Sequence, residues 1–202
     1  MSTTKHPISV IVPLMGRRRE FFKNYTLPLI RANNPAEIIV EDFEGNAPEK
    51  RNAGFQESTQ PFVFFCDDDI LLPADYLSTL LGVLLENPDK GYAYSGYQGI
   101  VIHKESHPMN GNFTIPGRAF NPIELRSGNY ISTMSLMRRE VFPGFDESLS
   151  RLQDWDLYLT MLDKGVSGIY VNKTFYAFYL DKGITMGGHE HAMQTIKQKH
   201  KL

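Results

Sequence analysis

The chain has 202 residues, a formal net charge of −2 at pH 7 and one cysteine, Cys66. Hydrophobic residues make up 42% and charged residues 22%, which is ordinary for a globular protein and excludes a collagen-like, disordered or disulfide-stapled chain. The near-neutral charge argues against a protein that coats nucleic acid through its overall charge. A single cysteine forms no intrachain disulfide, which suits a reducing compartment.

No segment has the pattern of a membrane span or a signal peptide. The longest apolar stretches, Ile8–Pro13 and Pro61–Cys66, have the length of strands and fall far short of roughly 18 residues. The residues that follow Met1 lack an apolar core and a small-residue cleavage site. We therefore expect a soluble, cytoplasmic protein.

The first half of the chain alternates strand and helix patterns. Apolar, β-branched runs predict strands at Ile8–Pro13, Glu37–Val40 and Phe62–Phe65. Apolar residues at helical spacing predict helices at 17–31, with a kink or break at Pro28, at 52–60 and at 73–85, with Pro73 in the first turn. This alternation predicts an α/β sheet with right-handed crossovers.

The second half is less regular. Strands are predicted at 92–97, 100–102, 132–137, 168–171 and 175–179, and a helix at 153–162. The polar stretch 103–129 predicts a long loop that is either functional or partly disordered. The glycine-rich segment 183–191 predicts flexibility, and 192–202 predicts either a basic helix or a disordered tail.

Three consecutive carboxylates, Asp67-Asp68-Asp69, follow the strongly apolar run 62–65. On an extended backbone Asp67 and Asp69 share one face and Asp68 points away. Two oxygen-rich groups at the carboxyl end of a strand suit a hard divalent cation such as Mg²⁺ or Mn²⁺, and this end of a parallel sheet is where ligands bind. The alternative is a solvated turn, with Asp75 near the start of the next helix.

The order of several motifs resembles the inverting glycosyltransferases of the GT-A fold, in particular those of the family 2 type. The matching segments are Ile8–Pro13 as the first strand, Arg51-Asn-Ala-Gly54, Asp67–Asp69, Pro73-x-x-Tyr76-Leu77, Met134–Glu147 and Leu152-Gln-Asp-Trp-Asp-Leu157. Together they span about residues 8–180, and their order and spacing give them specificity. The resemblance implies a Rossmann-like mixed central sheet flanked by helices in a single domain, 1–202. It assigns a nucleotide-sugar-binding half to about 1–100, an acceptor-binding half to about 101–182 and a flexible C-terminal loop and tail to 183–202.

The resemblance also implies a donor site. Asp67 and Asp69 would hold Mn²⁺ or Mg²⁺ against the donor diphosphate, with Asp69 preferred as the direct ligand and one carboxylate reaching the ribose. Pro13, Asp68, Lys50 and Arg51 would contact the nucleotide, although a surface charge pair is an equal alternative for Lys50. Glu41 and Asp42 share the assignment to the nucleotide base. They stand where the family shows two aspartates followed by Gly-Ser, so a UDP-sugar is favoured but the base stays open.

Two aspartates, Asp154 and Asp156, are candidates for the base that deprotonates the acceptor hydroxyl. On a helix with Trp155 facing the core, they lie about 100° to either side of it, and periodicity does not choose between them. The resemblance chooses Asp154 and leaves Asp156 as a structural carboxylate. Gln153 replaces the usual glutamate and removes a negative charge beside the base. The alternative is that both aspartates serve the helix N-terminus.

Histidines and aromatic residues give further candidates. On an extended segment, His189 and His191 face the same way and would add metal ligands, as a late histidine does in some enzymes of this fold; the alternative is a solvated tail. His103 and His107 are either solvated or in contact with the acceptor. Arg17–Arg19 lie either near phosphates or on a solvated face. Aromatic side chains stack on an acceptor sugar or belong to the core: Tyr94, Tyr97, Phe113, Phe120 and Tyr130.

The leading hypothesis is a metal-dependent glycosyltransferase that moves a sugar from a nucleotide donor to an acceptor hydroxyl with inversion. Direct displacement needs one base and no protein nucleophile, which agrees with the residues above. The acceptor is a sugar chain, a glycolipid, a protein side chain or a modified nucleobase. A nucleotidyltransferase would need a glycine-rich loop after the first strand, and Leu14–Arg19 has one glycine. A non-catalytic nucleotide- or sugar-binding module is the third hypothesis.

Overall fold

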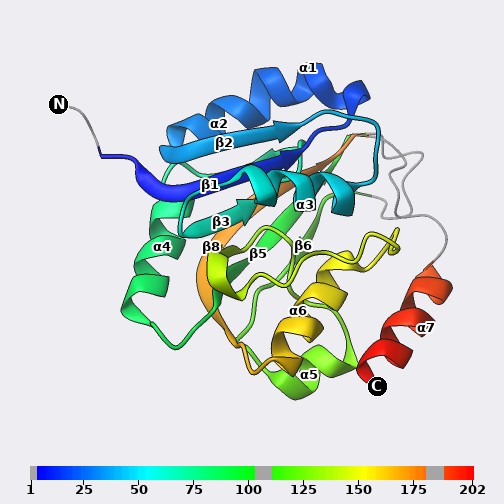
Figure 1. The fold of residues 1–202 in the computed structure, drawn as a ribbon. Coiled ribbons are helices and arrows are strands. Elements are labelled where there is room, and N and C mark those ends of the chain that lie inside the picture. Colours follow the sequence, from blue (N-terminus) through cyan, green and yellow to red (C-terminus); the bar gives the residue numbers. More distant parts are fainter. Residues whose placement is uncertain (1–3, 103–110, 181–188) are drawn as a thin grey trace.

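In the computed structural model, which describes residues 4–102, 111–180 and 189–202, eight strands form one mixed sheet (Figure 1). The order across the sheet is β2-β1-β3-β7-β5-β8-β4, and β6 pairs with the edge of β5. The strands are β1 (His6–Pro13), β2 (Pro35–Glu41), β3 (Phe62–Phe65), β4 (Ile70–Leu71), β5 (Tyr92–Val101), β6 (Phe113–Ile115), β7 (Leu136–Arg138) and β8 (Gly168–Tyr179).

The strand directions divide the sheet into two parts. β1 runs parallel to β2 and β3, which is the arrangement that the alternating first half predicts. β7 then lies antiparallel between β3 and β5, and β8 runs parallel to β5 and antiparallel to β4. The predicted mixed sheet is therefore confirmed.

Helices cover both faces of the sheet (Figure 1). Successive residues of β1 and β3 point to opposite faces, so Val10 and Phe64 enter one hydrophobic core and Ile11 and Phe65 enter the other. The first core lies under α2 (Leu27–Ala32) and α4 (Tyr76–Glu86); the second lies under α5 (Pro122–Ser127), α6 (Gln153–Asp163) and α7 (His189–His200), with α3 (Ala47–Glu57) at its edge. Burial on both faces explains why β3 is apolar throughout.

Three helix predictions need correction. The segment predicted as one helix at 17–31 is helical throughout but changes type: a 3₁₀ turn at 16–18 leads into the short α1 (Arg19–Phe21), a π-helical turn at Phe22–Thr26 and then α2. The irregularity expected at Pro28 is this π-helical turn, which ends directly before α2, where Pro28 lies in the first turn. α3 begins at Ala47 and not near residue 52, because Asn46 and Glu49 form a reciprocal capping box. Pro73 precedes α4 and is not in its first turn, since the helix starts at Tyr76.

The second half is more regular than expected. β5 and β8 are each continuous, because they pair with one another from Tyr92 opposite Gly168 to Val101 opposite Tyr179. The part of the expected loop 103–129 that is described contains β6 and α5, whereas 103–110, with His103 and His107, lies outside the described residues. The strand expected at 132–137 is shorter and occupies 136–138.

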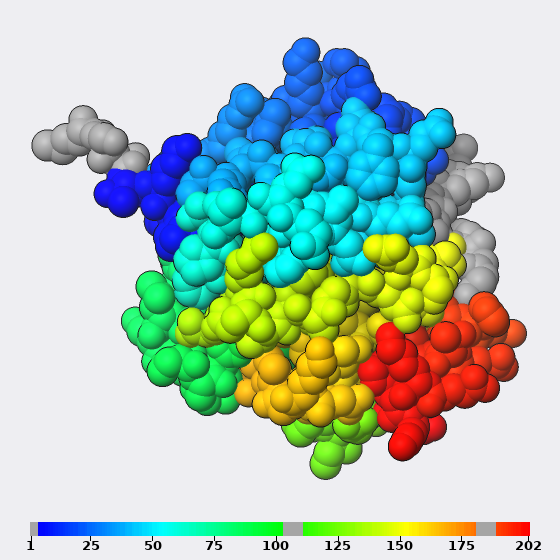
Figure 2. All heavy atoms as spheres, viewed as in Figure 1, coloured from blue at the N-terminus to red at the C-terminus, as the bar shows by residue number. Residues whose placement is uncertain are grey.

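The C-terminal segment resolves an alternative that the sequence left open. Residues 189–200 form α7, which packs beside α6 (Figures 1 and 2). Ala192 and Ile196 are buried in the second core, one helical turn apart. The glycine-rich residues 183–188 lie outside the described part of the chain, so their predicted flexibility is untested.

Candidate functional site

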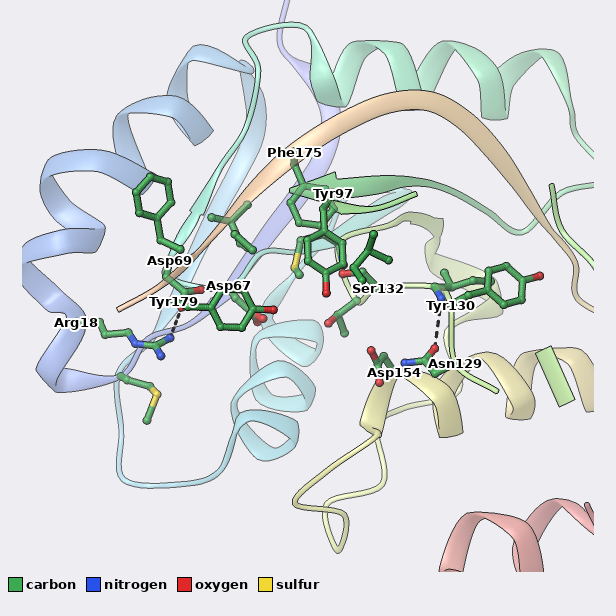
Figure 3. A pocket seen from close by; sticks show the side chains of 18 residues that line it. Arg18, Asp67, Asp69, Tyr97, Asn129, Tyr130, Ser132, Asp154, Phe175 and Tyr179 are labelled. Carbon is green, nitrogen blue, oxygen red and sulfur yellow. Dashed lines mark hydrogen bonds and ion pairs between the residues drawn. The ribbon is translucent and has the colours of Figure 1, made fainter. Parts of the chain in front are cut away.

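Two adjoining cavities lie between the carboxyl end of β3 and the start of α6. Figure 3 shows the side chains that line the inner one. The inner cavity has a volume of about 410 Å³ and is bordered by β5, β8 and residues 129–134. The outer cavity, of about 480 Å³, is bordered by Pro13, Ala47, Arg51 and residues 150–154. Both share the following lining residues: Met15, Arg18, Asp67, Tyr97, Asn129, Thr133 and Asp154.

The three aspartates after β3 have different surroundings. Asp67 accepts a hydrogen bond from Arg51 Nη2 at 2.5 Å, and Asp69 accepts one from Arg18 Nη1 at 2.5 Å. Asp68 is 2% exposed and turns toward the segment after β1, where it accepts a hydrogen bond from the backbone N–H of Met15 at 2.7 Å. Asp67 and Asp69 thus share the inner cavity, whereas Asp68 fixes the loop that follows β1.

Burial dominates the electrostatics of this triplet. Burial raises the pKa of Asp69 to about 8, and repulsion by Asp67 and Asp68 adds to this effect while the Arg18 guanidinium opposes it. Burial also raises the pKa of Asp68, against the hydrogen bond from Met15 and the charge of Arg18. When Asp69 is ionised, three carboxylates face two guanidinium groups, so a further cation at the cluster would stabilise this ionised form.

The chemistry of these ligands fits a hard divalent ion. Carboxylate oxygens are the ligands that Mg²⁺ and Mn²⁺ prefer. In the part of the chain that the structure describes, no group of three or more His, Cys, Asp or Glu residues has the arrangement of a complete metal site. Asp67 and Asp69 would therefore hold the ion together with phosphate oxygens and water, which is how Mg²⁺ is usually bound beside a diphosphate.

Arg51 connects the triplet to α6. Its Nη1 donates to Gln153 Oε1 at 2.8 Å, while Nη2 donates to Asp67. The close approach of α3 to β1 depends on Gly54, since a Cβ there would lie 2.5 Å from Ile11 Cγ2. The Arg-Asn-Ala-Gly pattern thus combines a cation at the cavity with a helix that has room to lie on the sheet.

The first turn of α6 separates the two candidate bases. Asp154 lines both cavities, and it accepts hydrogen bonds from the Asn129 side chain and from the backbone N–H of Trp155. Burial raises the pKa of Asp154, against these hydrogen bonds and the charge of Arg51. Leu152, just before the helix, has a left-handed backbone with φ of 54°, a strained conformation that sets the direction in which the helix starts.

Asp156 faces the opposite way. It is 3% exposed and accepts hydrogen bonds from Lys199 Nζ and His200 Nε2, both at 2.9 Å. His200 Nδ1 is in turn 2.7 Å from Asp163 Oδ2. Asp156 therefore anchors α7, and the structure places only Asp154 of the pair at the cavities.

Several predicted site residues lie away from the cavity walls. Lys50 is buried and donates to the backbone carbonyl of Leu14 at 2.7 Å, and Asp42 pairs with Arg19. Glu41 is 8% exposed, and its Oε1 is buried with no hydrogen-bond partner among the described residues. Burial and the charge of Glu57 raise the pKa of Glu41, against the charge of Lys50.

The late histidines are arranged differently from the prediction. His189 lines the outer cavity, but it begins α7 together with His191. The extended geometry expected for this pair is wrong, because helical residues two apart point about 200° away from each other. His191 is exposed and is not part of either cavity wall.

Three residues at the site were not singled out by the sequence. Met15 supplies a backbone N–H, Asn129 a side-chain amide and Tyr179 an aromatic wall. Ile131 N–H donates to Asn129 Oδ1 at 3.3 Å, which leaves the amide nitrogen to face Asp154. Nothing in a local pattern marks such residues; for Arg18 the only signal was the basic run Arg17–Arg19.

The fold and this site define a class of protein. The structure of S. aureus TarS 1–349 in complex with UDP-GlcNAc has a TM-score of 0.68 and 13% identity, over 97% of this chain and 66% of that one. Glucosyl-3-phosphoglycerate synthase from Mycobacterium tuberculosis, in complex with Mn²⁺, UDP-glucose and phosphoglyceric acid, has a TM-score of 0.65 and 12% identity, over 96% of this chain and 80% of that one. The chain thus has the GT-A glycosyltransferase fold, and it spans 60–66% of the length of the TarS structures.

A comparison of the sequence with family models identifies the family. The model of glycosyl transferase family 2 matches residues 18–144, which is more than half of the chain. No curated protein matches the chain in a sequence search. The chain belongs to glycosyl transferase family 2, so the predicted fold and family are confirmed.

Proposed function

We propose that the protein transfers a sugar from a nucleoside-diphosphate donor to an acceptor hydroxyl, with inversion and with the help of a divalent cation. One observation supports this function above all: Asp67 and Asp69 share a cavity with Asp154 (Figure 3). Hydrogen bonds from Arg51 to Asp67 and to Gln153 connect the two sides. A metal–diphosphate site thereby faces a candidate base across a space that holds a sugar.

The outer cavity is the donor site in this proposal. Pro13, Arg51, Asp67 and Asp68 line it, and the guanidinium of Arg51 suits a diphosphate. Glu41 lines neither cavity. Its assignment to the nucleotide base is supported by Oε1, a buried acceptor that has no hydrogen-bond partner among the described residues and would gain one from an N–H group of a ligand. Asp42 forms an ion pair with Arg19, and Lys50 donates a hydrogen bond to the backbone carbonyl of Leu14. In this proposal both residues therefore act on the nucleotide site through these neighbours. The UDP in the TarS and Mycobacterium complexes favours UDP as the nucleotide.

Asp69 and Asp67 are the proposed ligands of Mn²⁺ or Mg²⁺, with His189 as an additional ligand from the outer cavity. When bound, the ion supplies Lewis-acid stabilisation to the departing nucleoside diphosphate. Arg51 holds Asp67 in place and adds positive charge where the diphosphate develops negative charge. The Mycobacterium enzyme was crystallised with either Mg²⁺ or Mn²⁺, which supports this choice of ions.

Asp154 is the proposed base. Its raised pKa keeps it basic enough to take a proton from the acceptor hydroxyl as this oxygen attacks the anomeric carbon. Asn129 and the N–H of Trp155 orient its carboxylate. Direct attack from the side opposite the leaving group inverts the anomeric centre in one step and leaves no role for a protein nucleophile.

The inner cavity is the proposed acceptor site. Its walls carry Tyr97, Tyr130, Phe175, Phe178 and Tyr179, and rings of this kind stack on the apolar faces of sugars. This lining favours a sugar chain or a glycolipid headgroup, while a protein side chain or a modified nucleobase remains an alternative acceptor. None of the helices in the described residues is long and apolar enough to span a membrane. The cytoplasmic location stays a prediction.

A screen of nucleoside diphosphates by thermal shift, with and without Mn²⁺, tests the proposal. A ligand that binds only the folded state raises the melting temperature by mass action. We expect one diphosphate, UDP first, to stabilise the protein in a Mn²⁺-dependent way, and we expect Asp69→Ala to lose this effect. Slow hydrolysis of the matching nucleotide sugar, lost in Asp154→Asn, would exclude a non-catalytic module. Stabilisation by no diphosphate would contradict the proposal, and release of pyrophosphate would favour a nucleotidyltransferase.

A further inference from the structure

A guanidinium group stands at the proposed cation site. Arg18 Nη1 donates to Asp69 Oδ2 at 2.5 Å and to Asp68 Oδ1 at 3.1 Å (Figure 3). The Arg18 and Asp69 side chains are 15% and 14% exposed, so water screens their attraction only in part. The carboxylate that the site offers to a divalent cation is therefore already bound by a cation of the protein.

The two carboxylates that Arg18 contacts differ in how firmly they are held. Asp68 is fixed by the N–H of Met15, and its backbone carbonyl accepts a hydrogen bond from Thr26 Oγ1 at 3.0 Å. Asp69 lines the inner cavity, where a ligand reaches it. Arg18 can thus keep its bond to Asp68 while it exchanges Asp69 for another anion in the cavity.

The diphosphate of a donor is such an anion. Guanidinium groups bind phosphate oxygens with paired, charge-assisted hydrogen bonds, and Arg18 lines both cavities. Once Arg18 turns to the diphosphate, Asp69 becomes available to a metal ion that binds the same phosphates. Neither the metal ion nor the diphosphate binds as well alone. A metal ion alone must displace Arg18 from Asp69, and a diphosphate without metal meets the negative charge of Asp67 and Asp69.

We propose that Arg18 is a built-in counter-cation that occupies Asp69 in the ligand-free protein and transfers to the donor diphosphate, so that metal and donor bind together. This inference rests on the proposed function and deepens it. It makes Arg18 a positioning residue with two effects of opposite sign, because it weakens the binding of free metal and strengthens the binding of the metal–diphosphate pair.

Electron paramagnetic resonance of free Mn²⁺ tests the inference without any turnover. In the absence of nucleotide, we expect Arg18→Ala to bind Mn²⁺ at least about tenfold more tightly than wild type, since a charged hydrogen-bond partner of Asp69 is removed. UDP should raise the Mn²⁺ affinity of wild type more than that of Arg18→Ala, by a similar factor. Arg17→Ala, which removes an exposed neighbouring charge, is the matched control and should behave like wild type.

Further variants distinguish the outcomes. Arg18→Lys keeps the charge and should stay close to wild type in nucleotide-free Mn²⁺ binding. Asp69→Asn should lose Mn²⁺ binding both in the wild type and when combined with Arg18→Ala. The melting temperature of Arg18→Ala in metal-free buffer should fall and recover with Mn²⁺. Equal or weaker Mn²⁺ binding by folded Arg18→Ala, with UDP still raising the affinity of wild type, would overturn the inference and leave the proposed function intact. No Mn²⁺ binding by wild type in the presence of UDP would overturn both.

Discussion

The two aspartate-bearing segments on either side of the cavities are neutralised in different ways. In the segment after β3, Asp67 and Asp69 face the cavity and each accepts a hydrogen bond from an arginine. At the start of α6, the cavity-facing Asp154 has neutral hydrogen-bond donors, whereas the buried Asp156 takes Lys199 and His200. Asp67, Asp69 and Asp156 thus accept hydrogen bonds from basic side chains. Asp154 accepts them from amide groups, and burial raises its pKa against these bonds.

Asp154→Asn should have the largest effect of the variants at the two segments. The change keeps the shape of the side chain but removes the base, so we expect kcat to fall by about 10²- to 10⁴-fold. Donor binding should persist, because Arg51 and the acids after β3 are unchanged. The measurement is the rate of UDP release from the nucleotide sugar that the thermal-shift screen identifies. Activity close to wild type would move the role of base to another residue.

Asp156→Asn is the matched variant, two residues along the same helix. It leaves Lys199 and the buried His200 without their shared carboxylate, which should cost about 3 kcal/mol of stability, or roughly 6–12 °C in Tm. At a temperature where the variant is folded, its kcat should stay near that of wild type. Calorimetry and the same UDP-release assay check both parts. A loss of kcat in the fully folded protein would show that the two aspartates are not separated as the structure indicates.

Gln153→Glu restores the residue that the family usually has and adds a negative charge beside Asp154. Burial raises the pKa of Asp154, so activity should fall as the pH drops through this raised pKa. A second carboxylate beside Asp154 should raise that pKa further and shift the acidic limb of the kcat/KM profile upward, by about half a pH unit because Arg51 partly offsets it. A downward shift would contradict Asp154 as the group that titrates.

Glu37 lies outside both segments, and its substitution should have the smallest effect. Its pKa is lowered, whereas the pKa values of Asp69 and Asp154 are raised. Partial burial would raise its pKa, but hydrogen bonds from Ser9, Thr59 and Gln60 prevail and lower it from 4.5 to about 2. Its contribution to stability is therefore present above pH 4.5 and is lost as the pH falls toward 2. Urea denaturation between pH 6 and pH 3.5 should show the difference between wild type and Glu37→Gln shrinking below pH 4.5. A difference independent of pH would contradict this.

The sequence predicted the parts of the fold that depend on local patterns. The apolar runs at β1 and β3 and the helical spacing in α4 and α6 were sufficient to place these elements. β8 was predicted as two strands because polar residues interrupt its pattern, and only pairing with β5 keeps it continuous. α7 was left open because its two buried apolar residues, Ala192 and Ile196, give too weak a hydrophobic pattern.

The residues of the candidate site that belong to sequence motifs were predictable. Asp67, Asp69, Arg51 and Asp154 come from recognisable motifs, and the structure brings them together. The contact of Arg18 with Asp69 joins residues 51 apart, and Asn129 reaches Asp154 from a segment without regular structure. Such contacts depend on how the chain folds back on itself, which no local spacing encodes.

In the proposed function, the acids after β3 bind the donor with its metal and Asp154 does not. Isothermal titration of UDP in the presence of Mn²⁺ tests this directly in wild type, Asp69→Asn and Asp154→Asn. The predicted result is binding to wild type, a Kd within about threefold of it for Asp154→Asn, and a loss of at least about tenfold for Asp69→Asn. Equal binding by all three proteins, or loss in Asp154→Asn alone, would contradict the account.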